Sequence, residues 1–174
     1  LVFHGTGIAA VHRIGKVGTK AGNVKQAGTL ADLLVRGKAD AQLAAAHPQG
    51  KEEFCGMTIR GVTYDEKKTA GERLVLACSE LPNAEEKVIG SYRGFSMSLT
   101  VEDFGRDFIL TLKGKMNHRV TLGKDARGNL TRIDNALNAM PDRLQNVRNT
   151  LDALTAQMET AKAELGKPFP QEDE

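Results

Sequence analysis

The sequence predicts an α+β fold, and two patterns indicate it. Apolar and polar residues alternate through the middle of the chain, whereas an apolar residue recurs every third or fourth position near its C-terminal end. Of the 174 residues, 40% are hydrophobic and 26% are charged, a balance that suits one folded domain with an aliphatic core. Helices covering one face of an antiparallel sheet would bury both kinds of apolar surface.

Residues 1–50 are glycine-rich and basic. They carry six Lys or Arg residues against two Asp residues, and residues 1–28 show no sustained apolar period. We therefore expect residues 1–28 to form an irregular connector and residues 1–50 a flexible basic arm. The arm holds a short helix that begins at Thr29 and is interrupted at Gly37, and the Ala-rich run that follows could resume it. Pro48 and Gly50 mark the boundary of the arm.

A compact α+β domain is expected over residues 51–166. It opens with a β-compatible stretch between Phe54 and Tyr64. Asp65 is expected to cap a helix that ends before Pro82. One face of this helix carries Ala70, Leu74, Ala77 and Cys78.

A three-stranded antiparallel meander is expected next. One strand runs from Val88 to Val101, where apolar residues alternate with Ser and Thr. Two further alternating segments follow, over residues 108–112 and 116–122, with a turn at Gly114 between them. The short links favour antiparallel neighbours.

The C-terminal part has the most regular pattern in the sequence. Its apolar residues have a heptad-like spacing of three and four: Leu130, Ile133, Leu137, Met140, Leu144, Val147, Leu151, Leu154, Met158, Ala161 and Leu165. Pro141 interrupts this stripe, so we expect two helices with Pro141 in the first turn of the second. The stripe packs on the sheet, or the part from Leu144 to Leu165 forms a homodimer. Residues 167–174 are expected to be a frayed acidic tail.

No motif of a known catalytic or cofactor site occurs in the sequence, including the phosphate-binding, nucleophile-elbow and zinc-protease patterns. We therefore expect no cofactor, no metal and no enzymatic activity. An enzyme would need a pocket that gathers His118, a carboxylate and Tyr92, whereas a packed strand position is the simpler role for His118. Cys55 and Cys78 are expected to be buried, reduced thiols, which favours a cytoplasmic protein. No apolar run suggests a membrane span, and Leu1 suggests a piece of a larger protein.

Basic residues cluster between Phe104 and Arg132, and alternation places some of them opposite the apolar face of the meander. Such a face can meet phosphates through charge. The candidate nucleic-acid-binding residues are Lys113, Lys115, Arg119, Lys124, Arg127 and Arg132, with Tyr92, Arg93 and Phe95 as a stacking element. The alternative is a solvated face whose lysines protect an edge of the sheet.

Several segments together resemble one protein family. They are residues 57–64, 92–95, 110–114, 120–125, 128–137 and 167–172, the last of which is Lys-Pro-Phe-Pro-Gln-Glu. The chain resembles, over about residues 52–172, the C-terminal region of large helicase and DNA-methyltransferase-like proteins of bacterial conjugative elements. The resemblance implies a DNA-handling context and no catalytic residue, because the helicase and methyltransferase motifs of those proteins have no counterpart here. Residues 1–50 have no counterpart in that region.

The expected function is therefore a non-catalytic accessory, helicase-associated module of a mobile genetic element, in which a basic sheet face binds DNA. The alternative is a protein-interaction module in which the C-terminal helices dock on the parent helicase and methyltransferase domains or dimerise.

Overall fold

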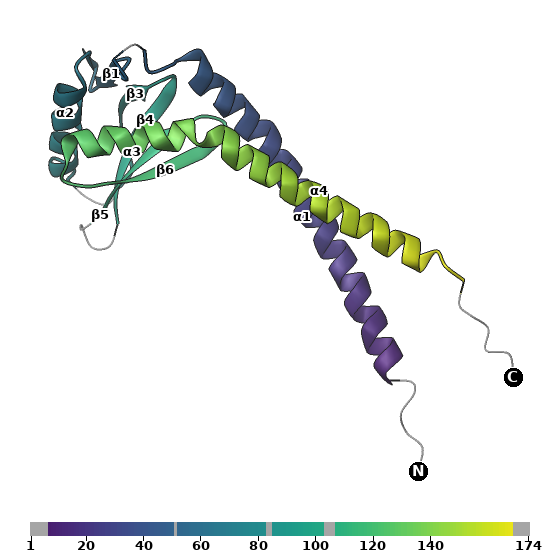
Figure 1. Cartoon of the computed structure of the whole chain (residues 1–174). Coiled ribbons are helices and arrows are strands. Elements are labelled where there is room, and N and C mark those ends of the chain that lie inside the picture. The colour runs from purple at the N-terminus through teal and green to yellow at the C-terminus, as the bar shows by residue number, and fades with distance from the viewer. Residues whose placement is uncertain (1–6, 51, 83–84, 103–106, 169–174) are drawn as a thin grey trace, which may run out of the picture. The chain divides into compact units, whose positions relative to one another are not determined.

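The computed structural model describes residues 7–50, 52–82, 85–102 and 107–168, with side chains from residue 21 onward (Figure 1). The elements in chain order are α1 (Gly7–Ala46), β1 (Met57–Ile59), β2 (Val62–Tyr64), α2 (Lys67–Ser79), β3 (Lys87–Tyr92), β4 (Phe95–Glu102), β5 (Asp107–Lys113), β6 (Asn117–Leu122), α3 (Ala126–Asn138) and α4 (Met140–Leu165). Contacts divide the chain into two units. Unit 1 comprises residues 1–35 and 145–174, and unit 2 comprises residues 36–144.

Unit 2 holds one six-stranded sheet in the order β2-β1-β3-β4-β5-β6, and every neighbouring pair is antiparallel. The α+β prediction is confirmed. The strand expected from Val88 to Val101 is two strands, β3 and β4, and the stretch before residue 65 is the hairpin β1–β2. The meander therefore has four strands, and pairing of β1 with β3 adds the hairpin to it.

Two Arg-Gly turns account for the extra strands. Arg93 and Gly94 have φ angles of 48° and 83°, and Arg60 and Gly61 have φ angles of 52° and 81°. Two consecutive residues with positive φ form the tight hairpin turn that matches the twist of the flanking strands. Arginine is not a typical residue for the first position, so residue type alone did not indicate a turn at Arg93.

The core lies on one face of the sheet. Cross-strand pairs such as Leu99 with Leu110 and Leu112 with His118 place most of the buried apolar side chains of β4, β5 and β6 on this face. The helices α2 and α3 pack beside each other in unit 2. They approach so closely that a Cβ on Gly71 would lie 2.4 Å from the carbonyl oxygen of Ala126.

The helix α2 begins one residue later than expected. Its N-cap is Glu66, not Asp65, and its buried face includes all four residues that the sequence indicated. Asp65 instead lies near Gly56, where a Cβ would meet its carboxylate oxygen at 3.1 Å.

The irregular connector expected over residues 1–28 is wrong for residues 7–28, because α1 is one continuous helix from Gly7 to Ala46. Glycine costs a helix only about 1 kcal/mol relative to alanine, and the first proline, Pro48, follows the end of α1. Gly37 does not interrupt the helix, since it is buried against Leu144. The expected boundary near residue 50 falls inside unit 2.

The C-terminal helices α3 and α4 meet at a single residue, Ala139, and form one bent helix. Pro141 is in the first turn of α4, as predicted. Leu130, Ile133, Leu137 and Met140 are buried in the core of unit 2. Within unit 1 the same stripe is buried at Leu154, whereas 61% of Leu165 is exposed. The predicted acidic tail lies outside the described residues from residue 169 onward.

Candidate nucleic-acid interface

The face of the sheet opposite the core carries a continuous row of polar side chains. The strand register pairs one residue of each strand with the next across all six strands. We call these residues the polar row: Thr63, Thr58, Ser91, Ser96, Lys113 and Asn117. All six side chains are at least partly exposed. The row therefore presents hydroxyl, amide and ammonium groups at neighbouring strand positions, about 4.8 Å apart.

A second row of paired residues lies beside the polar row on the same face. It contains Val88, Ser98, Thr111 and Arg119. Ser98 and Thr111 are buried even though they point away from the core, with 0% and 8% exposure. These two small side chains in the middle of the sheet are therefore covered, and the longer Lys113 and Arg119 lie at neighbouring positions in the register.

Both of these cations are paired with carboxylates. The Nζ atom of Lys113 lies 2.6 Å from Oε1 of Glu86, and Arg119 donates to Glu102. Lys113 donates a hydrogen bond to Glu86 and thereby lowers the pKa of that carboxyl. The four side chains are 36–56% exposed, and ion pairs at such exposure contribute little to stability. Loss of either ion pair would therefore cost the fold little stability.

The other predicted basic residues lie outside the strands. Lys115 lies in the β5–β6 turn, whereas Lys124 and Arg127 lie at the opposite end of β6 and the start of α3. Six residues of strand separate the two ends by roughly 20 Å. Arg132 donates to the carbonyl of Thr121 at 3.3 Å. The structure thus places only Lys113 and Arg119 of the predicted cations on the sheet face.

The predicted stacking element is wrong, because Tyr92, Arg93 and Phe95 are all buried. Tyr92 stacks on Phe54 at 5.9 Å and donates its hydroxyl to Asp134 at 2.7 Å. Phe95 lies against the ring of His118. Alternation along a single long strand could not show that the chain turns at residue 93, and the turn directs these side chains to the core.

Arg93 is the centre of a buried network. Its guanidinium donates to two backbone carbonyls at the end of α1, those of Ala44 and His47, and to the side chains of Asp134 and Asn138 in α3. The distances lie between 2.8 and 3.3 Å. Arg93 therefore connects the β3–β4 turn with α1 and α3, and its guanidinium is occupied by these four hydrogen bonds.

His118 is packed in unit 2, as expected. Its Nε2 atom lies 2.8 Å from Asp40, which also accepts the backbone N–H groups of Lys115 and Met116. Asp40 and His118 are 1% and 8% exposed. The pair connects the C-terminal part of α1 to the β5–β6 turn, and both side chains are shielded from solvent.

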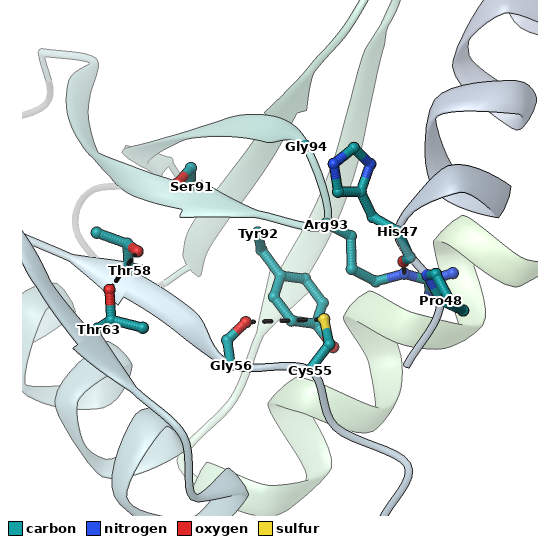
Figure 2. A pocket seen from close by; sticks show the side chains of 10 residues that line it. All are labelled: His47, Pro48, Cys55, Gly56, Thr58, Thr63, Ser91, Tyr92, Arg93 and Gly94. Carbon is teal, nitrogen blue, oxygen red and sulfur yellow. Dashed lines mark hydrogen bonds between the residues drawn. The ribbon is translucent and has the colours of Figure 1, made fainter. Parts of the chain in front are cut away.

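A hollow of about 260 Å³ lies at one end of the polar row (Figure 2). Thr58, Thr63 and Ser91 of the row line it, together with His47, Pro48, Cys55, Gly56, Tyr92, Arg93 and Gly94. Neither His118 nor a carboxylate is among the residues that line this hollow. Among the described residues no cluster of three or more His, Cys, Asp or Glu could hold a metal ion.

The two cysteines differ in exposure. Cys78 is buried as predicted, and desolvation raises its pKa to about 11. Cys55 is exposed, which corrects the prediction, and partial burial of its thiol raises its pKa as well. Neither thiol is activated as a nucleophile, because nucleophilic attack requires a thiolate.

Only part of this surface could be predicted from the sequence. The alternation of Ser96, Ser98 and Thr100 was visible, but the alignment of Thr58 and Thr63 with them depends on the pairing of β1 with β3. Their Oγ1 atoms lie 3.0 Å apart. That pairing joins residues more than 30 positions apart, for which local patterns carry no signal.

Comparison of the chain with protein-family models found no match, and searches of curated proteins and of solved structures found none either. In the part of the chain that the structure describes, no helix has both the length and the apolar character needed to cross a bilayer.

Proposed function

We propose that this chain is a non-catalytic accessory module of a DNA-processing protein of a conjugative element, and that its polar sheet face binds the phosphate backbone of DNA. The polar row is the observation that carries the proposal. Proteins contact phosphates mainly through Lys and Arg, Ser, Thr and Asn side chains and backbone N–H groups. The row and its neighbour Arg119 supply these side-chain types on one surface. The resemblance to helicase and methyltransferase-like proteins supports DNA as the ligand.

The proposal assigns a role to the two carboxylates as well. Glu86 and Glu102 hold Lys113 and Arg119 over the face, and DNA phosphates replace them as partners. Because the described aromatic side chains near this face are directed to the core, binding depends on the backbone rather than on base stacking. The affinity should therefore vary little with sequence and fall steeply with salt.

The test is fluorescence anisotropy with labelled DNA over a salt series. The variant Lys113→Ala/Arg119→Ala should bind roughly tenfold more weakly at moderate salt and reduce the slope of log K against log salt by about two. The variant Glu86→Gln/Glu102→Gln should bind more tightly than the unchanged chain, because it frees both cations and removes two negative charges from the face.

The matched control is Lys67→Ala/Lys68→Ala, which removes the same charge from α2, away from the polar row. An equal loss of affinity in this control and in Lys113→Ala/Arg119→Ala would contradict the proposal. So would an unchanged affinity of Glu86→Gln/Glu102→Gln.

A further inference from the structure

The helix α4 is buried along one narrow line. From residue 141 to the end of α4, the buried or half-buried residues are Leu144, Val147, Leu151, Leu154 and Met158. These are the members of the heptad-like stripe in this range, except for the last two, Ala161 and Leu165. Something in the chain therefore covers the stripe as far as Met158.

The helix α1 has a matching line. Between residues 21 and 35, the half-buried residues are Asn23, Ala27, Leu30, Leu33 and Leu34. Four of them, Asn23, Ala27, Leu30 and Leu34, are spaced by four, three and four residues. Unit 1 contains only residues 1–35 and 145–174, so each line is the available cover for the other.

One contact sets the register between the two helices. A Cβ on Gly37 would lie 2.4 Å from Cδ2 of Leu144, so α1 and α4 touch at these residues in unit 2. From this contact α1 continues toward lower numbers and α4 toward higher numbers, both into unit 1. The steps are the same on both helices, and they pair Leu34 with Val147, Leu30 with Leu151, Ala27 with Leu154 and Asn23 with Met158.

The charges agree with this register. It places Asp32 close to Arg148, and Lys25 between Asp152 and Glu159. Within the two stretches, residues 23–34 carry Lys25 and Asp32, and residues 147–158 carry Arg148 and Asp152. The contribution of charge to the pairing therefore comes from these individual opposite charges and not from the net charge of either stretch.

We propose that residues 23–34 of α1 and 147–158 of α4 form an antiparallel coiled-coil pair within one chain. The stripe of α4 between Leu144 and Leu165, which the sequence suggested as a homodimer surface, then binds α1. The pairing continues the Gly37–Leu144 contact and buries the apolar stripe with complementary knobs and holes. It is independent of the proposed DNA contact, which involves other residues.

Disulfide trapping tests the register. In a Cys55→Ser background, Ala27→Cys with Leu154→Cys should form an intrachain disulfide under mild oxidation. It should form at least tenfold faster than in the control Ala27→Cys with Ala161→Cys. The control moves one thiol by two helical turns, about 10 Å. The pair Asn23→Cys with Met158→Cys tests the same register without removing Leu154.

Equal rates for in-register and control pairs would overturn the proposal. Disulfides that form mainly between two chains would also overturn it, and would show that a second copy covers the stripe. Non-reducing electrophoresis distinguishes the two products by mass.

Discussion

At the scale of single residues, Arg60 and Arg93 show how one local conformation serves two different environments. Each precedes a glycine in a tight turn and has a positive φ angle. Arg60 pairs with Glu80 at the surface, where both side chains are more than 40% exposed. Arg93 pairs with Asp134 in the interior, where both are at most 5% exposed. The turn alone therefore does not decide how much the arginine side chain contributes to the stability of the fold.

We expect Arg93→Ala to lower the free energy of unfolding by about 3–5 kcal/mol, because it leaves the Asp134 carboxylate buried without a charge partner. Arg60→Ala, the matched control in the other turn, should cost at most about 1 kcal/mol. Urea unfolding followed by circular dichroism measures both. A similar small cost for the two variants would contradict the role assigned to the buried network.

At the scale of elements, α1 shows that glycine content alone does not predict an irregular segment. Its glycines are distributed along 40 helical residues, and no proline occurs among them. The helix α4 shows the reverse case, in which the spacing of apolar residues predicted the element and its first turn correctly. The pattern did not reveal which part of the stripe is covered.

Two leucines of α4 test how the stripe is covered. Leu154 is 8% exposed and Leu165 is 61% exposed. Leu154→Ala should reduce the free energy of unfolding by about 2–4 kcal/mol, because the side chain leaves a cavity in a packed contact. Leu165→Ala should change it by less than about 0.5 kcal/mol. Thermal and urea unfolding of the two variants would show equal effects only if the stripe were uncovered at Leu154.

At the scale of the whole molecule, close approach between elements limits which residues the chain tolerates. Gly71 lies in the middle of α2, where alanine would be the better helix former. The carbonyl of Ala126 occupies the space that a side chain would need. Gly28 of α1 has no heavy atom within 4 Å of the position of a Cβ.

We therefore expect opposite results from one substitution at two positions. Gly71→Ala should destabilise the fold by about 1–3 kcal/mol, since α2 and α3 must separate to admit the methyl group. Gly28→Ala should raise stability by up to about 1 kcal/mol through helix propensity. The midpoints of thermal unfolding should shift downward for the first and upward for the second. A rise in both would mean that α2 and α3 adjust without cost.

The sequence by itself determined the fold class, the buried face of α2, the alternation within β4, the strands β5 and β6, the position of Pro141 and the stripe of the C-terminal helices. These features follow from local periodicity, which adjacent residues express through side-chain direction. Tertiary structure decided where Tyr92 and Arg93 point and which cations share a face. It also decided how Thr58 and Thr63 join the polar row, and that Gly37 of α1 packs against Leu144 of α4. Each of these depends on contacts between distant segments, and such contacts leave no trace in the spacing of neighbouring residues.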